Sequence, residues 1–278
     1  MGSFGPVLWV TLVAWCGAAA LYALAGGRRP VLLAAHALTG LGLLVLGGFL
    51  GHLWWQLGRP PMRSLGETRL WYSLFLPVVG AACYLRWGYR WLLAWSLLVA
   101  AVFLGLNLAR PENFDRALMP ALQSPWFIPH VILFIFSYSV LGAAALVAAR
   151  GLWGRPGPLA DARGSEGPDG TGGSAEIRGA ALADQLVRLG FSLFTIAMLF
   201  GALWAKEAWG HYWTWDPKET WAFLAWVVYL VYLHLRHVRP RDLRTANLTL
   251  VLAFLVLLVC WFGVNYLPAA ATSVHIYS

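Results

Sequence analysis

Histidine is the side chain in this sequence best suited to bind a metal, and the chain has seven histidines. A neutral imidazole nitrogen is a common metal ligand, and a titratable group is costly to bury in a membrane-spanning run. Each histidine in such a run is therefore a candidate functional residue. A lone histidine there is more often a hydrogen-bonded packing residue, so its position relative to the other candidates has to decide between the two roles.

A second group of residues that could form a binding site is the tryptophan-rich stretch, residues 204–226 (WAKEAWGHYWTWDPKETWAFLAW). It holds six of the chain's 17 tryptophans, among them Trp209, Trp213, Trp215 and Trp221. Flat, amphipathic rings at this density indicate a surface at the membrane boundary that lies against a large planar molecule. A general aromatic belt explains the stretch less well, because a belt spreads its rings over all helices. Haem is the leading candidate for the planar molecule.

Asp216 and Glu219 also have a plain structural interpretation. The sequence Asp216-Pro217-Lys218-Glu219 places proline directly after a capping residue and glutamate three positions after it. This pattern predicts a helix that begins at Pro217, with Asp216 as its N-cap and Glu219 reaching back. The capping role is compatible with a contact between Asp216 and a bound ligand, so both roles stay open.

The apolar character of the whole chain sets the fold class. The sequence is 60% hydrophobic and 12% charged, with a mean hydropathy of +0.65, which excludes an ordinary soluble domain. About 20 apolar residues cross a bilayer as a helix. Runs of this kind predict an all-α, polytopic bundle of about eight transmembrane helices, at residues 6–26, 31–57, 70–87, 90–109, 126–149, 186–205, 217–236 and 246–267.

Cysteines and charges exclude other kinds of site. Cys16, Cys83 and Cys260 lie far apart in apolar runs without a CxxC pair, which argues against a disulfide framework or a thiolate metal site. The net charge of +8 comes from loop residues that set membrane orientation, so no nucleic acid is expected as a partner. Glu67 and Arg69, between the second and third helices, have the pattern of solvated loop charges.

The basic residues predict the orientation of the bundle. If odd-numbered helices run inward, 13 of the 20 lysines and arginines lie in cytoplasmic connections, which places both termini and the tryptophan-rich stretch outside. Residues 154–180 are rich in glycine, proline and charge and cannot bury a core. We therefore expect a five-helix half at residues 1–150, a flexible cytoplasmic linker at 151–183 and a three-helix half at 184–278.

Depth in this topology separates three histidines into two levels. His130 begins the fifth helix at the outer face and His275 follows the eighth helix on the same side, so the two can approach each other. Two imidazoles on opposite sides of a plane are a known axial ligation for haem iron. His234 lies 18 residues after Asp216, about 27 Å deeper by helical rise. If it binds haem, it marks a second, inner position.

The remaining histidines have weaker claims. His211 lies within the tryptophan-rich stretch and could contact a haem edge or propionate. His36 and His52, toward the inner and outer ends of the second helix, are alternative ligands at their own levels. His237 belongs to a basic patch at the inner end of the seventh helix, among Arg236 and Arg239.

Two segments resemble a known family. Residues 209–221 (WGHYWTWDPKETW), followed by Tyr232-Leu-His234, are similar to the WWD domain and downstream helix of CcsA/ResC-type cytochrome c biogenesis proteins of system II, in the haem-handling protein superfamily. The Asp-Pro-Lys-Glu continuation fits this type better than the CcmC-type haem transporters. Supporting similarity covers residues 124–141, residues 67–73 and the C-terminal tail.

The resemblance implies a function, a ligand set and partners. The chain would be one subunit of a holocytochrome c synthase (cytochrome c haem lyase) in a bacterial-type cytoplasmic or thylakoid membrane, with the WWD loop on the outer or lumenal side. It implies that His130 and His275 ligate haem b outside and that His234 assists haem entry from the cytoplasmic side. The implied partners are a CcsB/ResB-type membrane protein, apocytochrome c with its CxxCH motif, and thiol-reducing proteins. The substrate brings its own thiols, so no catalytic protein nucleophile is expected.

Three other functions are alternatives to this one. A haem exporter that delivers to a separate carrier, as CcmC-type proteins do, would show the same ligands. A structural haem-binding membrane subunit of the respiratory diheme kind would need paired histidines on facing helices at matching depth, and the only internal candidates, His36 and His234, are both on the inner side. A secondary transporter would need carboxylates near the midplane, whereas the 12 carboxylates are predicted to fall in loops or at helix ends.

Overall fold

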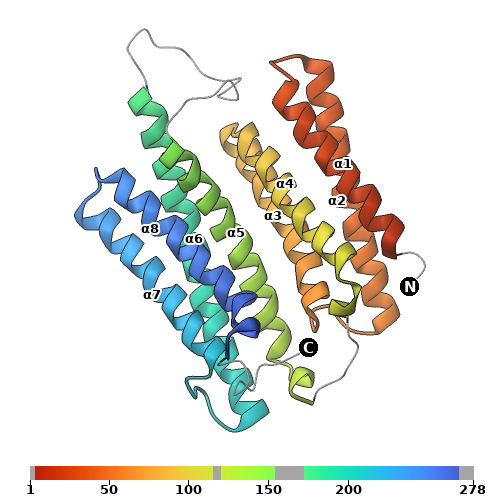
Figure 1. Ribbon diagram of the computed structural model, residues 1–278, viewed down its shortest axis with the longest axis vertical. Helices are drawn as coiled ribbons and strands as arrows, with labels where there is room; N and C mark the ends of the chain where they lie inside the picture. Colours follow the sequence, from red (N-terminus) through yellow and green to blue (C-terminus); the bar gives the residue numbers. More distant parts are fainter. Residues whose placement is uncertain (1–3, 115–119, 154–171, 269–278) are drawn as a thin grey trace. The chain divides into compact units, whose positions relative to one another are not determined.

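The computed structural model describes residues 4–114, 120–153 and 172–268 of the 278-residue chain. These residues form eight α-helices and no strand, which confirms the predicted all-α class (Figure 1). The helices are α1 Phe4–Leu24, α2 Arg29–Leu57, α3 Leu65–Trp87, α4 Arg90–Ala109, α5 Phe127–Trp153, α6 Gly172–Trp209, α7 Pro217–Val238 and α8 Leu243–Trp261. Short 3-10 turns lie at η1 Pro111–Phe114, η2 Pro120–Gln123 and η3 Gly263–Tyr266.

Seven of the described helices, all except α3, are long and apolar enough to cross a membrane. In α3, Tyr72, Ser73 and Pro77 interrupt the apolar residues. The eight helices coincide with the eight predicted runs, and the clearest differences are at their ends. α6 begins at Gly172 rather than at residue 186, α3 begins at Leu65 rather than at residue 70, and α8 ends at Trp261 rather than at 267 because the chain turns into η3.

The described residues fall into two compact units. The first contains α1 to α4 with η1, and the second contains α5 to α8 with η2 and η3. Part of the predicted linker at 151–183 lies outside the described residues. The predicted division into halves at residues 1–150 and 184–278 therefore stays a prediction.

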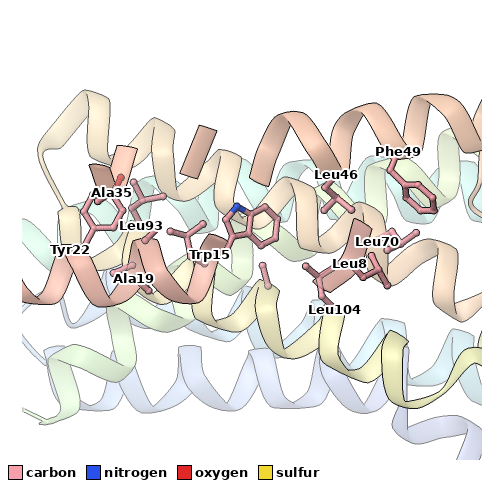
Figure 2. Close-up of a cluster of buried hydrophobic side chains, with 14 of the residues drawn as sticks. Leu8, Trp15, Ala19, Tyr22, Ala35, Leu46, Phe49, Leu70, Leu93 and Leu104 are labelled. Atoms are coloured by element: carbon pink, nitrogen blue, oxygen red, sulfur yellow. The ribbon is translucent and has the colours of Figure 1, made fainter. Parts of the chain in front are cut away.

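In the first unit, α1 packs against α2 and α4, and α3 packs against α4 and α2. Its core is a run of apolar side chains, and Figure 2 shows Trp15 in the middle of this run. Gly42 of α2 faces that indole, and a Cβ atom there would overlap the ring. Trp15 Nε1 donates a hydrogen bond to the Thr39 carbonyl oxygen at 3.4 Å. The glycine thus allows α1 and α2 to approach closely.

The start of α3 is organised by Glu67, which is only 6% exposed. Its carboxylate accepts hydrogen bonds from the backbone N–H groups of Arg63 at 2.6 Å and Ser64 at 3.3 Å, and Arg59 donates two more at 3.1 Å each. Arg69 is 7% exposed. The prediction that Glu67 and Arg69 are solvated loop charges is therefore wrong: both residues lie near the start of α3 and are buried, and the Ser64–Glu67 capping box holds the Glu67 carboxylate against the preceding loop.

In the second unit, α5 packs against α6 and α8, and α7 packs against α6 and α8 (Figure 1). Ser137 Oγ of α5 donates to the Gly190 carbonyl oxygen of α6 at 2.8 Å. Trp226 Nε1 of α7 donates to Thr195 Oγ1 of α6 at 3.0 Å. The start of α5, the α6–α7 connection (residues 210–216) and the end of α8 lie at one end of this unit (Figure 1). The sequence predicts that this end faces outward.

Candidate functional site

The predicted ligand His130 lies in the first turn of α5, directly against the backbone of α6. Its Nδ1 atom is 2.9 Å from the Ala197 carbonyl oxygen. A carbonyl oxygen can only accept, so Nδ1 carries the proton and donates. In the neutral imidazole this leaves the lone pair on Nε2, which is the form of histidine that ligates a metal.

Aromatic rings surround this imidazole. The centroid of the Phe134 ring is 4.7 Å from that of His130, and the centroid of the Trp204 ring is 5.3 Å from it. Trp204 is 3% exposed, and its Nε1 donates to the Ala121 carbonyl oxygen at 2.7 Å. Trp209 packs edge-on against Trp204 at 4.8 Å. The histidine is thus part of an aromatic wall that includes Trp204 and Trp209, the first two tryptophans of the tryptophan-rich stretch.

The α6–α7 connection begins at Gly210, where φ is +83°. The Gly210 N–H donates to the Lys206 carbonyl oxygen at 3.0 Å, and Lys206 Nζ donates to the Gly210 carbonyl oxygen at 2.8 Å. A left-handed residue at this point ends a helix, and glycine adopts it without strain. The chain therefore leaves α6 directly after Trp209 and turns toward α7.

Two tryptophans of this connection pack against each other, and one of them has an unusual backbone conformation. Trp213 and Trp215 pack at right angles with ring centroids 5.7 Å apart. Trp215 has a φ of 59°, which is rare for a bulky residue and costs about 1–3 kcal/mol. Its side chain is 62% exposed. A large exposed indole on a strained backbone is an expected feature of a binding surface.

The predicted cap of α7 is confirmed. The Lys218 N–H donates to Asp216 Oδ1 at 3.0 Å, and the Asp216 N–H donates to Glu219 Oε2 at 3.2 Å. Glu219 also accepts from the Thr214 N–H at 2.8 Å, a contact that the capping pattern does not include. Asp216 and Glu219 are 7% and 9% exposed. The two carboxylates thus hold both the start of α7 and the connection before it.

The structure brings some predicted site residues together. His130 and Trp209 both contact Trp204, and Trp213 contacts Trp215. Trp221 is half-buried in the second turn of α7. The end of α8 reaches this part of the unit, because Cys260 Sγ lies 3.6 Å from the Lys218 carbonyl oxygen. His275 lies outside the described residues.

His234 is at the other end of α7, exposed, and apart from His130. Near it lies a polar cluster that the sequence did not reveal, made of Asp184, Tyr232 and Arg236. Asp184 accepts from Tyr232 Oη at 2.7 Å, and from Arg236 Nε and Nη2 at 2.9 Å each. The spacing of Tyr232 and Arg236 on one helix face was the available signal. Asp184 lies inside α6 rather than at its end, because α6 begins at Gly172.

The other histidines occupy separate places. His211 is exposed in the α6–α7 connection, and His237 is exposed near the end of α7. In the first unit, His52 is exposed beside Trp55, and His36 lies half-buried between the rings of Tyr22 and Tyr84. Within the described ranges, no three histidine, cysteine or acidic side chains gather as a metal-ion site. A planar metal complex held by one histidine on each side does not require such a cluster.

Together, these features define a polytopic α-helical protein whose second unit presents a hydrogen-bonded histidine among tryptophans at one end. The model of the family described as cytochrome C assembly protein matches residues 68–271. The cytochrome c biogenesis protein CcsA of Synechococcus sp. (strain WH7803) is 31% identical, over 96% of this chain and 91% of its own length. The CcsA protein of Thermosynechococcus vestitus is 33% identical, over 95% and 92%. The chain belongs to the cytochrome c assembly protein family.

A solved structure shares the fold at lower sequence identity. A chain called cytochrome c haem lyase CcmF superposes with a TM-score of 0.66 at 16% identity. The match covers 96% of this chain and 50% of that one. The helical arrangement is therefore shared with about half of a larger protein.

Proposed function

We propose that this protein acts in cytochrome c biogenesis by holding haem at the outer end of its second unit and presenting it for attachment to apocytochrome c. The observation that carries the proposal is His130, whose Nδ1 donates to the Ala197 carbonyl oxygen and whose ring lies in the aromatic wall formed with Trp204. The family relatives named for cytochrome c biogenesis support it.

In this proposal histidines ligate the haem iron and tryptophans pack against the haem plane. His130 and His275 supply imidazole nitrogens on opposite sides of the haem iron. Trp209, Trp213, Trp215 and Trp221 supply flat apolar surface beside it. The donor set fits haem, since bis-histidine ligation and apolar packing are common ways in which proteins bind it. Asp216 holds the connection in place through the cap, and we include it among the haem-binding residues because it directly follows Trp215.

The reaction requires the protein to position haem against the cysteine thiols, and it requires no nucleophile from the protein. Each cysteine thiol of a CxxCH motif adds across one haem vinyl group: an S–C bond forms, the thiol proton goes to the other vinyl carbon, and nothing leaves. Fixing both reactants in one geometry is the main contribution expected of the protein. We place the protein as one subunit of a holocytochrome c synthase with a CcsB/ResB-type partner, supplied with reduced apocytochrome c by thiol-reducing proteins.

Haem would reach this site from the cytoplasmic side. His234 is exposed at the opposite end of α7 from the capped connection, where an imidazole can bind haem as it enters. A histidine of the partner would take the other axial position. We place the protein in a bacterial-type cytoplasmic or thylakoid membrane with the tryptophan-rich stretch outside, since the basic residues gather in the connections at the other end.

The test replaces His130 with glycine in the complex purified with its partner. We expect haem content, measured as the pyridine haemochrome, and holocytochrome c yield to fall together. Added imidazole should restore part of both, because it fills the vacated axial position. His237→Gly is the matched control, since His237 is exposed near the end of α7 and belongs to a basic patch rather than to the proposed haem ligands. Wild-type haem content in His130→Gly would refute the proposal, and haem loading without any thioether bond would favour an exporter.

A further inference from the structure

Gly201 of α6 faces the imidazole of His130 across the α5–α6 interface. A Cβ atom at position 201 would lie 2.6 Å from His130 Cε1 and 2.7 Å from His130 Nδ1. Real Cβ atoms essentially never come this close to another heavy atom. The histidine ring therefore occupies the space that any side chain at this position would fill.

The same glycine exposes the carbonyl group to which His130 donates. In an α-helix the Ala197 carbonyl accepts the N–H of residue 201, four positions later, so both residues lie on the same face. The carbonyl oxygen has a second lone pair, and His130 Nδ1 uses it at 2.9 Å. A Cβ atom at 201 would force the imidazole off this oxygen. Glycine is thus required for the contact, and the contact sets which nitrogen of His130 carries the proton.

We propose that Gly201 and the Ala197 carbonyl form a positioning device for the haem ligand, an inference that rests on the function proposed above. The carbonyl holds the Nδ1–H tautomer, so Nε2 keeps its lone pair for the iron. It also fixes the ring plane. A hydrogen bond of this kind makes the imidazole a better ligand, and its loss typically lowers metal affinity about 10- to 100-fold.

A purely structural role makes a different prediction. If the contact only ties α5 to α6, disturbing it should lower stability without changing the ligation of the haem that remains. Two other glycines of α6 provide matched controls. Gly179 has ordinary space, with Val147 Cγ1 at 3.9 Å from a Cβ atom, whereas Gly190 would meet Leu141 Cδ2 at 2.7 Å in the same α5–α6 interface.

The experiment compares Gly201→Ala, Gly190→Ala and Gly179→Ala in the complex with its partner. We expect Gly201→Ala to accumulate, because the ring that must move is the end of a side chain. It should lose haem on washing about 10- to 100-fold more readily and change the electron paramagnetic resonance signal of the oxidised haem. The 15N shifts of the haem-free protein should show that the His130 tautomer with the proton on Nδ1 is no longer the main one. Neither control should change the ligation.

A double variant keeps the test decisive even if Gly201→Ala is unstable. In His130→Gly the ring is gone, so a methyl group at position 201 has room, and the stability of the haem-free complex without imidazole should be the same with or without Gly201→Ala. A further loss of stability in the double variant would show that Gly201 acts through packing, and it would overturn the inference. Unchanged haem retention and spectrum in Gly201→Ala would overturn it too, while loss in His130→Gly would leave the proposed function standing.

Discussion

Glu219 should control the order of the tryptophan-rich stretch through the Thr214 backbone, separately from its role in the helix cap. Its carboxylate accepts the Thr214 N–H at 2.8 Å and the Asp216 N–H at 3.2 Å. A hydrogen bond to a charged acceptor contributes about 1.5–3 kcal/mol, or about 10- to 150-fold in a local opening equilibrium. Glu219→Ala should therefore release the connection before α7, including Trp213 and Trp215.

The assay is residue-resolved hydrogen exchange of the haem-free protein in nanodiscs. In Glu219→Ala, the amides of Thr214 and Asp216 should exchange about 10- to 150-fold faster. In Glu219→Gln the exchange rates of these amides should lie between those of Glu219→Ala and the wild type, because a neutral amide oxygen still accepts a hydrogen bond. Asp216→Ala should instead expose the Lys218 amide, at a cost of about 0.5–2 kcal/mol to the helix.

A matched control is Glu112→Ala, which removes a glutamate from an exposed ion pair with Arg110. Exposed pairs contribute little, so exchange in the tryptophan-rich stretch should not change. Unchanged exchange at Thr214 in Glu219→Ala would refute the reasoning that this carboxylate anchors the connection.

Two further outcomes are expected. Gly42→Ala places a Cβ atom within the Trp15 indole and should lower the free energy of unfolding by about 1–3 kcal/mol, measured by an unfolding titration in micelles. Gly47→Ala on the same helix has open space and should be neutral or stabilising by up to about 1 kcal/mol. Equal effects of the two substitutions would contradict the packing argument. His234→Ala should lower the haem occupancy of the purified complex but leave the spectrum of the residual haem unchanged, because His234 and His130 lie at opposite ends of the unit; a changed axial-ligand spectrum at normal occupancy would contradict entry through His234.

The sequence was informative wherever a signal is local. The eight apolar runs, the start of α7 at Pro217 and the Asp216–Glu219 capping box could be predicted because periodicity and capping chemistry act within a few residues. The family could be identified from residues 209–221 for the same reason. Helix ends were less certain: α8 continues into a 3-10 turn after Trp261, and apolar residues there do not distinguish the two conformations.

Contacts between helices could not be predicted. Nothing near Gly201 indicates that its missing side chain makes room for His130, 71 positions earlier in the sequence. Glu67 was misjudged because Arg59 and the capping box bury it only once the loop folds back. A single sequence carries no record of which distant residues meet, so these pairings required the structure.

The cluster of Asp184, Tyr232 and Arg236 has a consequence for how the α6–α7 hairpin moves. The six residues from Gly210 to Trp215 and the Asp216 cap join the two helices at one end, and the cluster joins them near the other, through partners 48 and 52 positions apart. Two helices joined only at their connection can separate at the other end. Because contacts join α6 and α7 at both ends, and Trp226 joins them to Thr195 in between, we expect the two helices to tilt together, so that a displacement at the end with the Asp184 cluster also moves the tryptophans at the other end.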